Sequence, residues 1–278
     1  MRILSPLRLA VIAAVVFLGL SAAHVGRAQA VSGGVKPVPK ATPTPTAVIP
    51  AKIDLKNLNV AQLAEITIAA YGIRQRLDQV RKTTFERGTT SYAGPDGKPE
   101  QANYQRFVIR GASLGKERIR LDQEFPNARY SLIFSDGAVS GMYNNTVFTP
   151  RDDVSKRFEN QIVHGIEALL RYQENESKLD LQPREKIMGV DYYVLDLTDK
   201  QERKTRFYIS AKYFRVMILT YEDGGVRYRR KFYDYNSAQG TLVPFRTVLW
   251  ADDKQVEESE IGTITFGQKV DEGLFSLS

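Results

Sequence analysis

The spacing of apolar residues predicts an amphipathic helix near the start of the folded part of the chain. From Leu63 to Val80, apolar residues recur three or four positions apart, which places them in one stripe along a helix. Asn59 and Gln62 stand three residues apart just before this stripe and match a capping box. The stripe is therefore expected to face an apolar surface elsewhere in the fold.

After residue 83 the period becomes that of β-strands. Short runs rich in aromatic and β-branched residues are separated by turn signals such as Gly94–Gly97, Asp136-Gly137 and Asp223–Gly225. This pattern predicts a meander of antiparallel strands. The predicted strands are Tyr104–Arg110, Glu117–Leu121, Tyr130–Phe134, Tyr192–Leu197, Thr205–Ile209, Arg215–Tyr221, Arg227–Tyr235, Val243–Trp250 and Glu258–Phe266.

Helical spacing returns between the two series of strands, over residues 153–175. One face of this segment is apolar, and charged residues such as Arg157 and Glu159 lie off it. A second amphipathic helix is therefore predicted to interrupt the sheet. The expected fold class is mainly β (α+β), an antiparallel sheet with an amphipathic helix on either side of the first strands.

The N-terminal residues 1–30 have the three parts of a secretory signal peptide. Arg2 and Arg8 precede an apolar run, Leu9–Ala23, and Ala28-Gln29-Ala30 is a small-x-small cleavage site. The run is shorter than the roughly 18–20 residues of a spanning helix, so cleavage is preferred over an uncleaved anchor. Residues 31–52 are rich in Pro and Thr and are predicted to be a disordered linker, which leaves 53–278 as a single domain.

Composition narrows the classes of function. Removing residues 1–30 takes three arginines from the 39 basic residues and no acids, so 36 basic residues face 32 acidic ones, a net charge of +4. An exported chain with so small an excess is not expected to bind nucleic acid. The absence of cysteine excludes disulfides, thiolate metal sites and a lipidated N-terminal Cys. We therefore expect the mature protein to be periplasmic, soluble and monomeric.

The residues offer no signature of catalysis. His164 is the one histidine after residue 30, and its neighbours lack the spacing of a metal site, so a structural or solvent-facing role is expected. Adjacent acids such as Asp252-Asp253 are typical of solvated turns, although distant strands can still assemble a carboxylate pair. No G-x-G-x-x-G or Walker sequence occurs. We expect no enzyme activity, cofactor or metal.

Basic and aromatic residues interleave over residues 227–235. On a strand this run places Tyr228, Arg230, Phe232 and Asp234 on one face and the remaining residues on the other. A half-buried strand with a basic outer face explains the run, and transient contact with anionic lipid head groups is the functional alternative.

The order of the elements from Ala61 to Phe275 resembles the periplasmic lipoprotein carrier and outer-membrane lipoprotein-sorting family, the LolA/LolB-like fold. The residues that carry the resemblance are Leu132–Gly137, an apolar strand ending in an Asp-Gly turn, the helix over 153–175, Gly189–Leu195, Arg206–Ile209, the Gly-x-x-x-Pro step in Gly240–Arg246, and the closing Glu260–Phe266 with Val270–Phe275. No Trp follows Asp136-Gly137, which departs from the family pattern. The resemblance implies an unclosed β-barrel whose helices cover a hydrophobic cavity for acyl chains.

The leading hypothesis is a non-enzymatic carrier or binding protein that encloses lipid or lipoprotein acyl chains between the sheet and its helices. Its alternative is a periplasmic envelope sensor or protein-interaction module with a packed interior and an envelope protein as partner. Each candidate position is also a plausible core residue. Assuming regular alternation, the candidate ligand-binding residues are Phe107, Ile109, Ile119, Leu121, Leu132, Phe134, Phe158, Ile162, Ile166, Leu169, Phe207 and Ile209.

Overall fold

The computed structural model describes residues 57–94, 98–144 and 146–277. The predicted signal peptide, the predicted linker and part of the Gly94–Gly97 turn lie outside the described residues. None of the described helices is long and apolar enough to cross a bilayer.

The N-terminal stripe folds as two helices, α1 (Val60–Tyr71) and α2 (Arg74–Val80), instead of one. The capping box is confirmed, because the Asn59 side chain accepts from the Gln62 N–H at 2.9 Å and the Gln62 side chain accepts from the Asn59 N–H at 3.0 Å. The predicted single helix is wrong at Gly72, whose φ of 137° no helix accommodates. A Cβ at Gly72 would lie 3.2 Å from the Gly240 carbonyl oxygen, so only glycine fits this close approach comfortably.

The strands of the first series precede the central helices. They are β1 (Thr83–Ala93), β2 (Pro99–Ile109), β3 (Arg118–Glu124), β4 (Arg129–Ser135), β5 (Ala138–Tyr143) and β6 (Thr146–Phe148). A short 3-10 helix, η1 (Leu114–Lys116), joins β2 to β3. The change to strand periodicity at residue 83 coincides with the start of β1, for which the sequence pattern gave no bounds, and β5 and β6 were missed. The Asp136-Gly137 turn is confirmed by positive φ at both residues.

The second series follows the helices and closes the chain. Its strands are β7 (Lys178–Ile187), β8 (Val190–Thr198), β9 (Lys204–Ser210), β10 (Val216–Asp223), β11 (Val226–Ala238), β12 (Thr241–Ala251) and β13 (Lys254–Phe266). The edge strand β7 was missed, because most of its residues are exposed and charged or polar. A last 3-10 helix, η2 (Glu272–Phe275), lies against β3 and β4.

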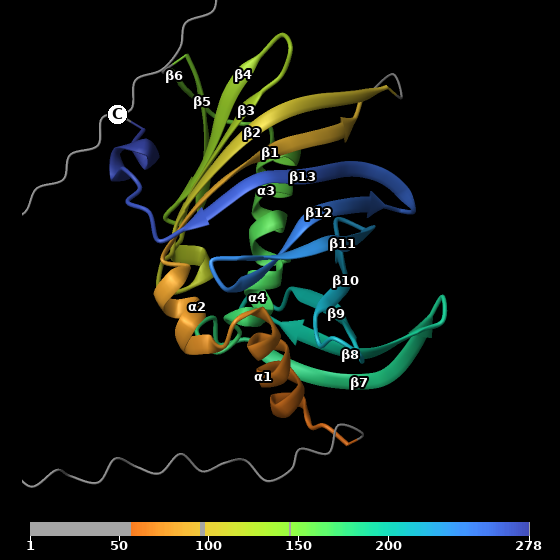
Figure 1. The fold of residues 1–278 in the computed structure, drawn as a ribbon. Coiled ribbons are helices and arrows are strands. Elements are labelled where there is room, and N and C mark those ends of the chain that lie inside the picture. The colour runs from red at the N-terminus through yellow and green to blue at the C-terminus, as the bar shows by residue number, and fades with distance from the viewer. Residues whose placement is uncertain (1–56, 95–97, 145, 278) are drawn as a thin grey trace, which may run out of the picture. The chain divides into compact units, whose positions relative to one another are not determined.

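The strands of the described chain form one antiparallel sheet, curved around the helices (Figure 1). Its order is β6-β5-β4-β3-β2-β1-β13-β12-β11-β10-β9-β8-β7, so the two meanders join where β1 pairs with β13. The edge strands β6 and β7 do not pair with each other, which leaves the barrel unclosed. The predicted fold class is confirmed.

The predicted central helix is also interrupted. It consists of α3 (Asp152–Val163) and α4 (Ile166–Leu170), which Figure 1 shows behind the curved sheet. His164 ends α3, and Gly165 takes an extended conformation that starts α4. The break allows the buried His164 ring to bond Thr205 on β9, a contact that local sequence does not reveal.

The basic and aromatic run lies on β11 and is a half-buried strand, as one reading predicted. Its Phe232 is buried, and Arg229 and Lys231 on the other face lie over the Trp250 ring at 5.5 and 5.3 Å. Regular alternation fails at Asp234, whose φ of 51° lets the next residue, Tyr235, turn inward. The Tyr235 hydroxyl bonds that of Tyr71 at 3.0 Å, which ties β11 to α1.

Candidate ligand-binding cavity

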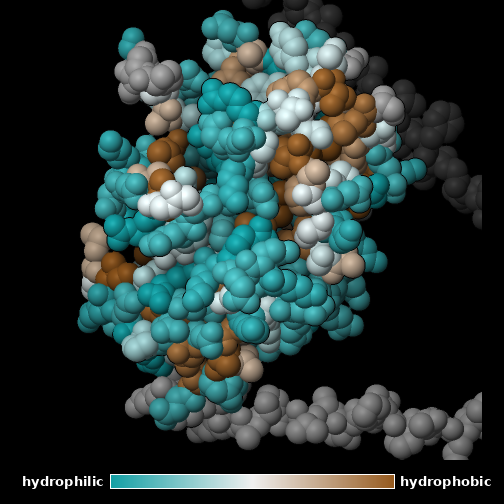
Figure 2. Space-filling model, turned by 180° about the vertical axis from the view of Figure 1, so that it is seen from behind, coloured by the Kyte–Doolittle hydropathy of each residue, from teal (hydrophilic) through white to brown (hydrophobic). Residues whose placement is uncertain are grey.

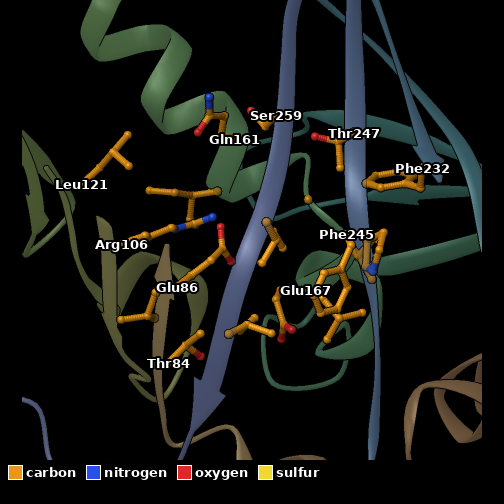
Figure 3. Close-up of a pocket in the computed structure, with 18 of the residues that line it drawn as sticks. Thr84, Glu86, Arg106, Leu121, Gln161, Glu167, Phe232, Phe245, Thr247 and Ser259 are labelled. Carbon is orange, nitrogen blue, oxygen red and sulfur yellow. The ribbon is translucent and has the colours of Figure 1, made fainter. Parts of the chain in front are cut away.

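A cavity of about 250 Å³ lies between α3–α4 and the inner face of β1, β2 and β11–β13. Alternation along the strands selects its lining, since Tyr104, Arg106 and Val108 of β2 face it while the residues between them do not. Figure 3 shows Gln161 entering from the helix, Glu86 and Arg106 from one side of the sheet, and Phe232 and Phe245 from the other. The apolar lining comes mainly from Val108, Leu114, Leu121, Ile162, Ile166, Phe232, Leu242, Val243, Phe245, Ile261, Ile264 and Phe266.

Three of the twelve candidate residues line this cavity: Leu121, Ile162 and Ile166. Leu121 comes from β3, whereas the two isoleucines come from the helices that cover the space. Seven others are buried in the hydrophobic core instead of in its lining. They are Ile119, Leu132, Phe134, Phe158, Leu169, Phe207 and Ile209.

Phe107 and Ile109 lie on the opposite face of the sheet. They are offset by one position from Val108, whose side chain reaches the cavity, and successive residues of a strand point to opposite faces. Phe107 stacks on Phe85 at 4.8 Å between ring centroids, so an apolar pair occupies the outer face here. In the sequence, an outward-facing Phe looks like a core residue. The alternation along β2 was therefore assigned with Phe107 and Ile109 facing inward, whereas Val108 faces inward.

The lining is more polar than the sequence indicated. It includes four arginines and four glutamates, none of which was among the candidate ligand-binding residues: Arg81, Arg106, Arg110, Arg230, Glu86, Glu117, Glu167 and Glu257. Most of these charges bond a partner within the fold. The signal that could have found them is weak, because charged residues on half-buried strands usually face solvent.

The most buried charge near the cavity is Arg171, just after α4, with a side chain 1% exposed. Its guanidinium forms an ion pair with Glu117 and donates to the Glu174 carboxylate at 2.7 Å and to the Gly111 carbonyl at 2.6 Å. Burial raises the pKa of Glu117 to about 7, while the charge of Arg171 opposes that rise. These bonds fix the end of α4 against the segment between β2 and β3.

One ion pair and a hydrogen bond hold the start of α4. Arg81 pairs with Glu167 and donates to the Leu242 carbonyl at 2.9 Å, so it joins α4 to β12. The positive charge of Arg81 and those of neighbouring arginines hold the pKa of the Glu167 carboxyl below its usual value, although burial opposes this. The helix over the cavity is therefore anchored at both ends.

Arg106 differs from the other arginines of the lining. Its Nε is buried without a hydrogen-bond partner, as are those of Arg81 and Arg230, but its guanidinium forms none of the ion pairs found among the described residues. Glu86, which is directly opposite it in the β1–β2 register, accepts a hydrogen bond from the Tyr104 hydroxyl at 2.6 Å. Arg230 is 3.7 Å from Glu257, which also accepts from Gln161. The cavity thus combines an apolar surface with a few charged groups.

His164 is buried beside the cavity and has a structural environment. Its Nδ1 lies 2.7 Å from the Thr205 hydroxyl oxygen, and its ring stacks on Tyr221 at 4.0 Å. Burial lowers the pKa of His164 to about 4, so its imidazole is neutral at neutral pH. Among the described residues, no three His, Asp or Glu side chains gather closely enough to hold a metal ion.

Comparison with known proteins identifies solved structures with a similar fold. No family model and no curated protein matches the sequence. The structure is similar to a LolA superfamily protein from Nitrosomonas europaea, with 16% identity, a TM-score of 0.56, and coverage of 79% of this chain and 98% of that one. The chain has a LolA-like fold.

Two further solved structures share this fold with the chain. An outer membrane lipoprotein-sorting protein domain from Vibrio parahaemolyticus matches with a TM-score of 0.51 and 13% identity, over 78% of this chain and 95% of that one. A DUF1329 family protein from Desulfovibrio piger matches with a TM-score of 0.57 and 13% identity, over 78% and 97%. At such identities the likeness establishes the LolA-like fold and no more.

Proposed function

We propose that this chain is an exported, non-enzymatic carrier or binding protein of the periplasm that encloses a lipid or lipoprotein acyl chain. The observation that carries the proposal is the cavity between the concave sheet face and α3–α4, with its aliphatic and aromatic lining. A packed interior would have favoured the sensor alternative. The LolA-like fold supports the carrier reading, since one structure with this fold bears the name of an outer membrane lipoprotein-sorting protein domain.

The volume of the cavity limits what it holds. At about 250 Å³ it accommodates a chain of about eight methylenes, if each takes roughly the 30 Å³ of a liquid water molecule. Each buried methylene contributes about 0.8 kcal/mol to the free energy of binding, so eight contribute about 6 kcal/mol. This corresponds to a dissociation constant in the range of tens of micromolar. The cavity therefore fits one acyl chain or part of one.

Two neighbouring residues of β2 give a matched test. Val108→Trp would occupy part of the cavity, whereas Phe107→Trp would change the outer face one position away. We expect Val108→Trp to weaken binding of the fluorescent fatty acid cis-parinaric acid at least tenfold, and Phe107→Trp to leave it unchanged. Circular dichroism checks that both variants fold. Equal binding by the two variants would contradict the proposal.

A second candidate function, contact with an envelope protein, is supported by the edge strand β6. Val147 and Phe148 of β6 are 43% and 38% exposed, and Tyr143 at the end of β5 is 49% exposed. Figure 2 shows hydrophobic residues gathered over the corner of β4–β6. An exposed apolar edge strand can pair with a partner's strand. Val147→Lys would weaken such an association and leave binding of cis-parinaric acid unchanged.

A further inference from the structure

The hairpin between β7 and β8 carries the most exposed large hydrophobic side chain of the described residues. Met188, in the turn between the two strands, is 93% exposed, and Val190, the first residue of β8, is 45% exposed. Figure 1 shows this hairpin extending past the ends of the neighbouring strands. Its tip is therefore a protruding apolar point and not the border of the core.

Turn chemistry does not account for Met188. The two-residue turn Met188-Gly189 has φ values of 47° and 82°, which correspond to a type I′ turn. Asn, Asp or Gly suits the first position of that turn, whereas an unbranched apolar residue gains nothing there. The methionine contributes neither to the turn nor to the core, so its side chain is available for an external apolar phase.

A second turn lies beside the tip. The Ala211 N–H donates to the Asp191 carbonyl at 3.0 Å, which places the β9–β10 turn next to the start of β8. This turn exposes Tyr213, whose ring is 54% exposed and has Lys212 and Arg215 over it, each at 5.0 Å. The aromatic residue thus lies at the base of the apolar tip, within a basic setting.

The charges around the two turns favour an anionic surface. Arg184, Lys186, Lys212 and Arg215 face two acids, Glu185 and Asp191, so the local net charge is +2. The Lys186 ammonium is 4.0 Å from the Asp191 carboxylate, and both side chains remain about two-thirds exposed, at 66% and 65%. Tyrosine and long basic side chains at the edge of a small apolar tip are typical of membrane interfaces.

We infer that the Met188 hairpin and the Tyr213 turn form a contact site for an anionic lipid surface, into which Met188 and Val190 insert. The tip is too narrow for a stable protein interface, which buries roughly 800 Å² on each partner. Insertion of a few side chains, aided by basic neighbours, is sufficient for reversible binding to a bilayer surface. The inference goes beyond the proposed function and does not depend on what the cavity holds.

The absence of cysteine from the chain allows a site-specific test. In the full chain, Met188→Cys carries an environment-sensitive NBD label at the tip, and Gln201→Cys carries the same label in the exposed β8–β9 turn at the other end of β8. On vesicles of phosphatidylethanolamine with phosphatidylglycerol, we expect a blue shift and protection from iodide at position 188 and neither change at position 201. Vesicles of phosphatidylcholine alone should give a smaller shift.

A second variant tests the energy of the contact. Met188→Asn suits the turn, so it keeps the fold, and it should weaken vesicle binding about tenfold in co-sedimentation. Because residues 1–56 are the same in all variants, their own affinity for vesicles cancels in the comparison. An unshifted label at position 188 in the presence of vesicles, or equal binding by Met188→Asn, would overturn the inference.

Discussion

Replacing Arg171 with Met should destabilise the protein strongly, because it removes the charge that pairs with a buried carboxylate. Arg171 is 1% exposed and Glu117 8% exposed, and the guanidinium also bonds Glu174 and the Gly111 carbonyl. Breaking a buried ion pair from one side costs about 3–5 kcal/mol. We expect a loss of about 4 kcal/mol at pH 8, measured by urea unfolding.

The size of this loss should depend on pH. Burial raises the pKa of Glu117 to about 7, above its value in the unfolded chain, so its folded form binds a proton more readily. Ionised Glu117 therefore lowers stability as pH rises through about 7, and Arg171 offsets this. At pH 5 the carboxyl is protonated in both proteins. The loss should then fall to about 2 kcal/mol, the contribution of the remaining hydrogen bonds.

The double variant Arg171→Met with Glu117→Gln is the matched control. Since it leaves no ionisable group at position 117, its loss of stability relative to the wild type should be about 2 kcal/mol at pH 5. The loss should be smaller at pH 8, where ionised Glu117 destabilises the wild type. A loss below about 1 kcal/mol for Arg171→Met at pH 8, or the same loss at pH 5 and pH 8, would refute the reasoning.

Three further variants test the fold around the cavity. Burial lowers the pKa of His164 to about 4, so between pH 6.5 and pH 4 only the unfolded chain binds the proton. The free energy of unfolding should therefore fall by about 3 kcal/mol over this pH range. Urea unfolding of His164→Gln should not show this dependence on pH. Gly72→Ala should cost more than about 1 kcal/mol in thermal unfolding, whereas Gly262→Ala, with φ outside the left-handed region, should cost little; equal costs would contradict the role of the positive φ. Asn59→Ala should cost about 1 kcal/mol through loss of the capping box, and an unchanged melting curve would count against that assignment.

Local chemistry made the larger features of the fold predictable. The capping box at Asn59 and the positive-φ turn at Asp136-Gly137 depend on residues a few positions apart, and both are present. The breaks at Gly72 and His164 depend on Gly240 and Thr205, which are far along the chain. Sequence periodicity contains no information on these partners. It therefore predicted one helix in place of α1 and α2, and one in place of α3 and α4.

The cavity was only partly predictable for a related reason. The apolar stripe of the central helix correctly indicated Ile162 and Ile166, since a helix face is set by spacing alone. Along β2 the lining residue is Val108, because both faces of this strand carry apolar side chains and alternation could be counted from either. Alternation also placed Arg230 on the same face as Phe232, and both line the cavity, but the partners of the charged residues were not predictable, because pairs such as Arg171 and Glu117 join different elements.

The measurement that tests the central claim most directly is native mass spectrometry, with lipid extraction, of the protein purified from its own envelope. The proposed function predicts a bound lipid or acylated molecule in a one-to-one ratio, released on unfolding and absent from the Val108→Trp variant. A wild-type protein that is reproducibly empty, or one whose bound lipid persists in Val108→Trp, would contradict the claim that the cavity holds an acyl chain.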